Sequence, residues 1–355
     1  MQIFERLRID SHEQLIFFRE QFSGLKAIIA IHDTTLGPAI GGVRMWKYPS
    51  EDEAIEDVLR LSFAMTLKAA GAGVNFGGGQ AVIIGDPKKQ RSEALFRGVG
   101  RFIEGLGGRF IAAEDVGTTY EDMDYIRMET RYVVGIPSSR GGSGDPSPMC
   151  AYGVIRGIEA CQEFRTGNDS LEGVKIAVQG VGKVGSAVVS MLIERGARVT
   201  IADIDPQAVE KIRNQYDVEV VSPDEIYSLD CDIFCPCALG GVINDQTIEL
   251  LRCKVVAGAA NNQLDKSRHG DLLDQKGIIY APDYIINAGG LINVVDELEG
   301  YDQARAMRKT SAIKDVLLSI LERSKAQRIP TWRAANELVM ERIEKVARVR
   351  RSYLP

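Results

Sequence analysis

The stretch Lys175-Ile-Ala-Val-Gln-Gly-Val-Gly-Lys-Val-Gly185 decides the fold of this chain. Its apolar start predicts a strand, and the residues from about Val184 to Glu194 predict a helix. Between them, Gly180 permits a tight turn, Gly182 lets the backbone approach a pyrophosphate, and Gly185 lets the helix pack closely on the strand. Because the helix N-terminus offers free N–H groups to phosphates, the segment predicts a dinucleotide-binding βαβ unit.

An acidic residue ends the next predicted strand. Asp203 directly follows the apolar run Arg198 to Ala202, about 20 residues beyond the glycines, as the fingerprint requires. Its carboxylate can accept hydrogen bonds from both ribose hydroxyls and would repel a 2′-phosphate, so we expect NAD rather than NADP. In this βαβ unit, the residues expected to bind NAD are Gly180, Val181, Gly182, Lys183, Val184, Gly185 and Asp203.

The pattern around this unit predicts an α/β chain of two domains. Further strand-like runs at residues 232–235, 254–258 and 277–281 favour a doubly wound, mostly parallel sheet. Upstream, residues 25–136 alternate helical periodicity with strand-like runs at 27–31, 81–84, 109–113 and 132–136, and a helix is expected to begin at Ser50. Two further helices are expected at 302–327 and 331–348.

The domain boundary is expected in residues 138–148, where Gly, Ser and Pro crowd together and no periodicity remains. We therefore predict a substrate-binding and oligomerisation domain at 1–140, onto which the C-terminal helix of about 331–355 folds back. The Rossmann NAD-binding domain is predicted at 148–328.

Composition excludes several classes of protein. The 355 residues carry a net charge of −6, and no basic stretch is long enough to follow a phosphate backbone, so nucleic acid is not an expected partner. No apolar run approaches the roughly 20 residues that span a bilayer. We therefore expect no membrane association and a cytoplasmic location. The six cysteines are expected to be reduced thiols in a core, the three histidines to be structural, and no metal site is expected.

Three polar features of the first domain lie where an apolar core would not favour them. Lys68 follows an apolar helix face, the glycine-rich run 71–79 would let a ligand approach the main chain, and Glu114-Asp115 ends a predicted strand. Taken singly, Lys68 could equally be a solvated lysine at a helix end, and Asp115 could be the N-cap of a following helix.

Taken together with the second domain, these features resemble the amino-acid dehydrogenases of the glutamate, leucine, phenylalanine and valine family, with the leucine enzymes as the nearest pattern. The similarity runs almost end to end. The stretches that carry it are Gly37-Pro-Ala-Ile-Gly-Gly-Val-Arg44, Met65-Thr-Leu-Lys68, Ala113-Glu-Asp-Val-Gly117, Cys237-Ala-Leu-Gly240, Ala260-Asn-Asn-Gln263 and Pro282-Asp-Tyr-Ile-Ile-Asn-Ala-Gly-Gly290.

The resemblance implies an NAD-dependent enzyme that oxidises an L-amino acid to its 2-oxo acid and ammonia in a cleft between two domains. It implies that Lys68 holds the substrate carboxylate and that Asp115 exchanges protons with the substrate nitrogen. The further residues it implies at the cofactor are Cys150, Cys237, Ala238, Leu239 and Asn261. Those it implies at the substrate are Ile40, Gly41, Met65, Ala113, Asn262, Leu291 and Val294. Because the side-chain pocket is apolar, an aliphatic or aromatic substrate is favoured over glutamate.

Two positions depart from the family pattern. The family's glycine-rich segment ends in a second lysine, to which the resemblance assigns activation of the water that attacks the imine, and this chain has Gln80 there. A glutamine amide cannot take up a proton, so deamination is expected to be attenuated. At Cys150 the family usually has a threonine that bonds the nicotinamide carboxamide, and a thiol is a weaker partner.

Three interpretations of these departures stay open. The chain could be an amino-acid dehydrogenase with reduced activity, a reductase of a preformed imine, or a non-catalytic protein that binds NAD or an amino acid. Lys68 and Asp115 count against the third. A homo-oligomer is expected, with the strand at 26–32 as a candidate edge for subunit contact.

Overall fold

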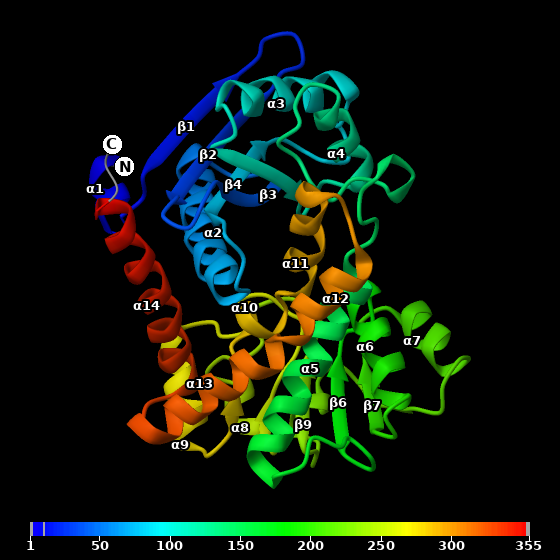
Figure 1. Ribbon diagram of the computed structural model, residues 1–355. Coiled ribbons are helices and arrows are strands. Elements are labelled where there is room, and N and C mark those ends of the chain that lie inside the picture. Colours follow the sequence, from blue (N-terminus) through cyan, green and yellow to red (C-terminus); the bar gives the residue numbers. More distant parts are fainter. Residues whose placement is uncertain (1–2, 10, 353–355) are drawn as a thin grey trace. The chain divides into compact units, whose positions relative to one another are not determined.

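The computed structural model describes residues 3–9 and 11–352 (Figure 1). The chain divides into two compact units. Unit 1 comprises Met1–Asp145, Asn293–Gln303 and Val339–Pro355, and unit 2 comprises Pro146–Ile292 and Ala304–Leu338. Among the described residues, no helix is both long and apolar enough to cross a membrane.

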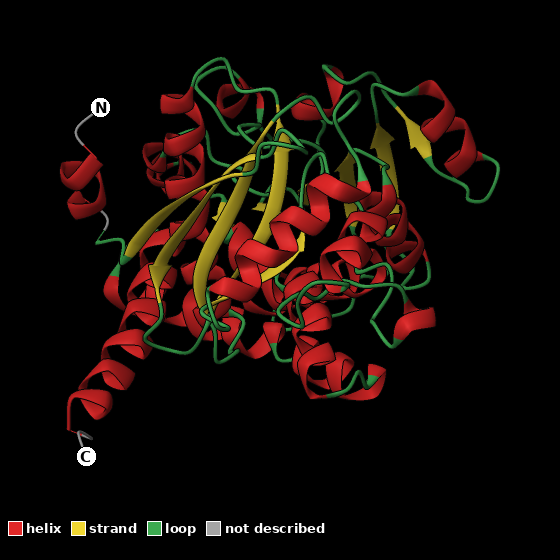
Figure 2. Cartoon of the chain, turned by 90° about the horizontal axis from the view of Figure 1, so that it is seen from above, coloured by secondary structure: helices red, strands yellow, loops and turns green. Residues whose placement is uncertain are grey.

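A five-stranded sheet organises unit 1. Its strands are β1 (Gln14–Arg19), β2 (Lys26–Asp33), β3 (Ala39–Trp46), β4 (Gly77–Ile84) and β5 (Phe110–Glu114), in the order β1-β2-β4-β3-β5. β2 is antiparallel to β1 and β4, whereas β3 is parallel to β4 and β5. Figure 2 shows these strands in yellow, side by side. The helical segments of this part of the chain are α1 (Ile3–Ile9), α2 (Glu51–Gly71), α3 (Glu93–Gly105), α4 (Tyr120–Arg127) and the 3-10 turn η1 (Ser138–Arg140).

The two faces of this sheet bury different helices, because successive side chains of a strand point to opposite sides. Ile28, Ala30 and Val82 pack against α2, which begins after the N-cap Ser50 as expected. Ile29, Ile31, Ala81 and Ile83 join the cluster that contains Leu95 and Phe96 of α3 and Met123 of α4. The sheet is therefore the middle layer of unit 1 and fixes the residues at its strand ends.

Two expectations for unit 1 are wrong, and one alternative considered for Asp115 is excluded. The strand at 26–32 is not an edge, because β1 pairs outside it, so the sheet edges are β1 and β5. Residues 132–136 form no strand, only a single bridge between Ala112 and Val133. The N-cap before α4 is Thr119 rather than Asp115.

The glycine-rich run also differs from its expected form. Gly77, Gly78 and Gly79 lie inside β4 rather than in a loop. A Cβ on Gly78 would collide with Thr66 of α2, and a Cβ on Gly79 would approach Phe110 to 2.8 Å. These glycines therefore allow close packing of β4 against its neighbours.

A six-stranded parallel sheet organises unit 2. In the order β8-β7-β6-β9-β10-β11, its strands are β8 (Glu219–Val220), β7 (Arg198–Ala202), β6 (Lys175–Gln179), β9 (Ile233–Pro236), β10 (Val255–Val256) and β11 (Ile279–Tyr280). Numbered from β6 along the chain, this is the 3-2-1-4-5-6 order of a dinucleotide-binding fold. The expected doubly wound Rossmann sheet is confirmed, and its short strand β8 is one that the sequence did not predict.

Helices cover this sheet, and the remaining helices follow it along the chain up to Ser352. They are α5 (Ser147–Thr166), α6 (Lys183–Ile193), α7 (Pro206–Arg213), α8 (Thr247–Leu250), α9 (Ser267–Gln275), α10 (Asp283–Ile286), α11 (Gly289–Val295), α12 (Gln303–Ser311), α13 (Ile313–Gln327) and α14 (Thr331–Ser352), with the 3-10 turns η2 (Glu225–Ser228) and η3 (Asp296–Glu299). The helix expected at 302–327 is thus divided at Ala312. The part of α14 from Val339 belongs to unit 1.

The cysteines and histidines occupy distinct environments. All six cysteines are free thiols, but only four are buried, and Cys150 and Cys237 are partly exposed. The buried His12 and His32 lie edge to face with ring centroids 4.7 Å apart, and His269 Nε2 lies 3.0 Å from Asp245. In the part of the chain that the structure describes, no group of three His, Cys, Asp or Glu side chains could hold a metal ion.

Candidate functional site

Asp115 lies at the carboxyl end of β5, where side chains of neighbouring strands converge on it. Gln80 Nε2 of β4 donates to Asp115 Oδ2 at 2.7 Å, and Arg44 Nε of β3 donates to the same oxygen at 3.1 Å. The hydroxyl of Thr118 accepts from the backbone N–H of Asp115 at 3.0 Å. A Cβ on Gly42 would approach the Asp115 Cβ to 2.5 Å, so glycine at 42 makes room for the carboxylate.

Gln80 is held at both ends of its amide. Its Oε1 accepts from the Gly42 N–H at 3.1 Å, while its Nε2 donates to Asp115, and the residue is only 2% exposed. The Gly42 donor and the Asp115 acceptor fix which end of the amide is oxygen and which is nitrogen. Neither end can remove a proton from water, so position 80 contributes a rigid hydrogen-bond bridge and no base.

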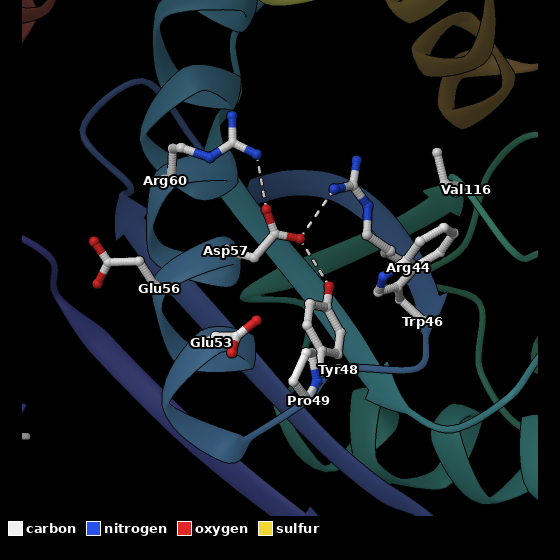
Figure 3. A pocket seen from close by; sticks show the side chains of 9 residues that line it. All are labelled: Arg44, Trp46, Tyr48, Pro49, Glu53, Glu56, Asp57, Arg60 and Val116. Carbon is white, nitrogen blue, oxygen red and sulfur yellow. Dashed lines mark hydrogen bonds and ion pairs between the residues drawn. The ribbon is translucent and has the colours of Figure 1, made fainter. Parts of the chain in front are cut away.

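Arg44 links Asp115 to a second carboxylate. Its Nη1 donates to Asp57 Oδ2 at 2.9 Å, and the Tyr48 hydroxyl donates to the same oxygen at 2.7 Å (Figure 3). Burial would lower the pKa of the Arg44 guanidinium, but Asp115 and Asp57 outweigh it and raise that pKa. Arg44 is therefore a permanent cation braced between two carboxylates.

The Asp57 end of this network opens into a pocket of about 480 Å³. Figure 3 shows Arg44, Tyr48 and Arg60 directed at the Asp57 carboxylate, with Glu53 and Glu56 on the same helix. None of the residues expected to contact substrate lines this pocket. We assign it no ligand.

Asp57 makes the stability of the protein depend on pH. Burial would raise the pKa of this carboxyl, but hydrogen bonds from Tyr48 and Arg60 and the charge of Arg44 lower it below its ordinary value. A depressed pKa stabilises the fold above the unfolded-state value of about 4 and loses that contribution as the pH falls. In urea unfolding, Asp57→Asn should therefore cost about 1–3 kcal/mol near pH 7.

The same comparison supplies its own control. The stability difference between the wild type and Asp57→Asn should shrink steadily below about pH 4, because protonation then removes the charge from the wild type too. A difference that stays constant down to pH 3 would show that the ionised carboxylate does not stabilise the fold.

Lys68 lies in the last turn of α2, where its helix end is tied to the C-terminal helix. Arg342 Nη1 of α14 donates to the Ala70 carbonyl at 2.7 Å, and its Nη2 donates to Asn75 Oδ1 at 3.0 Å. A cation at the last carbonyls of a helix stabilises that end.

The residues expected at the substrate fall in both units: Ile40, Gly41, Met65, Lys68, Ala113 and Val294 in unit 1, and Asn262 and Leu291 in unit 2.

The glycine loop of unit 2 has the form that a dinucleotide requires. Gly180 has φ +92° and leaves no room for a Cβ, which would lie 2.7 Å from that of Ala238. A Cβ on Gly185 would collide with the Gly180 carbonyl oxygen, whereas nothing lies within 4 Å of a Cβ on Gly182. The loop thus packs tightly on its inner side and is open at the N-terminus of α6.

Asp203 is oriented by the same loop. Its Oδ2 accepts from the Val181 N–H at 2.7 Å, and its Oδ1 accepts from the Asp205 N–H at 2.8 Å. The apolar side chains of Ile204 and Leu239 are exposed by 86% and 79%. Leu239 is one of the residues expected to line the cofactor, and Ile204 directly follows Asp203.

Asn287 joins two of the expected cofactor residues. Its Nδ2 donates to Asn261 Oδ1 at 2.7 Å and to the Ala259 carbonyl at 3.1 Å, and Cys150 Sγ lies 3.6 Å from its backbone oxygen. Asn262, next to Asn261, has φ +51°, a left-handed conformation that asparagine tolerates well. Neither Arg44 nor Asn287 was assigned a role from sequence, although both lie within the quoted stretches. Arg44 could have been identified, because it is a charged residue within the otherwise apolar strand β3.

Comparisons with known proteins agree over the whole chain. Residues 12–132 match the family described as "Glu/Leu/Phe/Val dehydrogenase, dimerisation domain", and residues 141–207 and 200–351 match "Glutamate/Leucine/Phenylalanine/Valine dehydrogenase". The chain is 54% identical to leucine dehydrogenase of Thermoactinomyces intermedius, covering 100% of this chain and 97% of that protein. It is 51% identical to phenylalanine dehydrogenase of the same organism, covering 99% and 97%. The crystal structure of L-tryptophan dehydrogenase from Nostoc punctiforme is similar with a TM-score of 0.86 and 45% identity, covering 97% of this chain and 99% of that one.

Proposed function

The chain belongs to the Glu/Leu/Phe/Val dehydrogenase family of NAD-dependent amino-acid oxidoreductases, and from this premise we propose that it acts on the CH–NH₂ group of an apolar L-amino acid with attenuated deamination. The observation that carries the attenuation is Gln80, whose amide is held between Gly42 and Asp115. We further propose that the protein forms a homo-oligomer, since the matched N-terminal family description names a dimerisation domain. We also propose a cytoplasmic location.

The residues of unit 2 fit NAD, which accepts a hydride when it is bound. The open side of the loop at Gly182 and the N-terminus of α6 would receive the pyrophosphate. The oriented Asp203 carboxylate would accept from the adenosine ribose, and Asn261, fixed by Asn287, would lie at the nicotinamide end with Cys150.

Asp203 should set the preference for NAD over NADP. Asp203→Ser removes the carboxylate that would repel a 2′-phosphate, so we expect the ratio of the dissociation constants for NADPH and NADH to fall at least about tenfold. Asp205→Ser is the matched control, because Asp205 caps α7 by accepting from the Gln207 N–H. Fluorescence titration with both cofactors gives the ratio without any turnover, and an unchanged ratio would remove Asp203 from the ribose site.

In unit 1, Asp115 is proposed to accept the proton of the substrate ammonium. An amine must lose this proton before its carbon can release hydride, and a carboxylate held by Arg44 and Gln80 is oriented for the transfer. Arg44 is a positioning residue here, since it acts through Asp115 and is itself braced by Asp57 and Tyr48. Lys68 would hold the substrate carboxylate as a point charge.

The apolar residues proposed around the substrate side chain favour leucine, valine or phenylalanine over glutamate. The test measures NADH formation from NAD with each of these four amino acids. We expect slow formation with one or more of the apolar three and none with glutamate. NADH formation with glutamate alone would contradict the proposed substrate class. So would a protein that binds NADH but oxidises none of the four amino acids.

A second candidate is reduction of a preformed imine, which the Gln80–Asp115 hydrogen bond favours. Imine reduction needs a hydride and one proton but no activated water, so a bridge at position 80 would suffice. NADH consumption with a cyclic imine but not with a 2-oxo acid plus ammonia would select this candidate. Consumption with both would select the dehydrogenase.

A further inference from the structure

We propose that Cys235 and Cys237 are a peroxide-sensitive dithiol whose oxidation to a disulfide weakens dinucleotide binding by unit 2. The consequence for NADH rests on the proposed function, whereas formation of the disulfide does not. Cys235 lies in β9 and Cys237 directly follows that strand, with Pro236 between them. Their sulfur atoms are 3.6 Å apart.

One of the two thiols, that of Cys237, differs from the buried cysteines in its surroundings. Cys237 is partly exposed, and a hydrogen bond from Cys235 lowers the pKa of its thiol, so it holds more of the reactive thiolate. Burial raises the pKa of Cys161 and of Cys231 to about 12 and that of Cys253 to about 11. Cys237 is therefore the expected first site of oxidation. Cys235 is 0% exposed, so we expect it to react with the oxidised Cys237 and not with peroxide from the solvent.

The chemistry needs only a peroxide as oxidant. The Cys237 thiolate attacks one oxygen of hydrogen peroxide, the O–O bond breaks, and the released hydroxide takes up a proton to leave as water. The Cys235 sulfur then attacks the resulting sulfenic acid, an S–S bond forms, the S–O bond breaks, and the hydroxide leaves as water with the Cys235 proton. Two thiols lose two electrons in total, and the peroxide is reduced to two molecules of water.

The position of Cys237 connects this reaction to the glycine loop. Its N–H donates to the Gln179 carbonyl at 2.7 Å, immediately before Gly180, and its Cβ lies 3.3 Å from the position of a Cβ on Gly185. In a disulfide the two sulfurs lie about 2.05 Å apart. Closing the present 3.6 Å separation would draw Cys237 toward Cys235. The adjacent Ala238, which packs against Gly180, would move with it.

The test treats the reduced full-length protein with hydrogen peroxide, alkylates the remaining thiols and analyses the peptides by mass spectrometry. We expect the peptide containing both residues to lose two hydrogen atoms between Cys235 and Cys237, with reversal by dithiothreitol. The dissociation constant for NADH should rise at least tenfold and recover on reduction. Cys235→Ala should stop at a Cys237 sulfenic acid that dimedone traps, whereas Cys253→Ser should behave as the wild type.

The outcomes separate the two proposals. Absence of the two-hydrogen loss, or its appearance between other cysteines, would overturn the dithiol. A disulfide that leaves NADH binding unchanged would overturn its effect on the glycine loop. A reduced protein that does not bind NADH at all would contradict the proposed function, while the mass measurement would still decide whether the dithiol exists.

Discussion

Gln80→Lys should increase the steady-state rate of NADH formation from an apolar L-amino acid at alkaline pH at least about a hundredfold, the scale on which a general base acts. The wild-type amide bridges Gly42 and Asp115 and cannot take up a proton. At this position, only 2% exposed in the wild type, burial and the nearby Arg44 cation favour the neutral lysine amine, whereas the Asp115 carboxylate favours the ammonium. Alkaline pH supplies the neutral form. It would restore the group that activates water toward the imine.

The control variants distinguish a base from a general effect of substitution. Gln80→Met removes both hydrogen bonds without adding a base and should not increase the rate. Gln207→Lys makes the same chemical change at an exposed glutamine and should leave the rate unchanged. A Gln80→Lys protein that binds NADH but remains as slow as the wild type would refute the assignment of position 80 to water activation.

Asp115→Asn should lower the rate by about 10²- to 10⁴-fold, because an amide of nearly the same shape cannot accept the substrate proton. The loss is best measured in the Gln80→Lys background, where the rate is high enough to follow a large decrease. The dissociation constant for NADH should not change, since Asp115 belongs to unit 1 and the glycine loop to unit 2.

Asp57→Asn is the matched control for this loss. It removes a carboxylate bonded to the same Arg44 but leaves Asp115 able to accept a proton, so its effect on the rate should be much smaller. Equal losses in the two variants would show that the Arg44 network supports the fold of unit 1 and that Asp115 has no separate role in proton transfer.

The sequence predicted the parts of the fold that local pattern determines. Strand β6, the three glycines, α6 and Asp203 follow one another along the chain, so their geometry is encoded within about 30 residues. The amphipathic α2 and its cap at Ser50 are local in the same sense. By contrast, the strand order of unit 1 depends on pairing between distant segments, and β1 covering the edge of β2 gave no local signal.

The candidate site divides in the same way. Lys68, Gln80 and Asp115 were identified from stretches that resemble the family, but the contacts of Gln80 were not, because they depend on Gly42 and Asp115, which are 38 and 35 residues away. The glycines of β4 were expected in a loop for a related reason. A glycine needed for packing against Thr66 or Phe110 looks the same in sequence as one that admits a ligand.

We expect the chain to transfer hydride normally and to be slow only in the step that needs activated water. We would mix the wild type rapidly with NAD and whichever of leucine, valine and phenylalanine it oxidises fastest, and follow NADH absorbance. We predict a fast burst of about one NADH per site followed by a slow steady state, and a steady state close to the burst rate in Gln80→Lys. A slow wild-type time course without a burst would place the defect in hydride transfer itself and contradict the account.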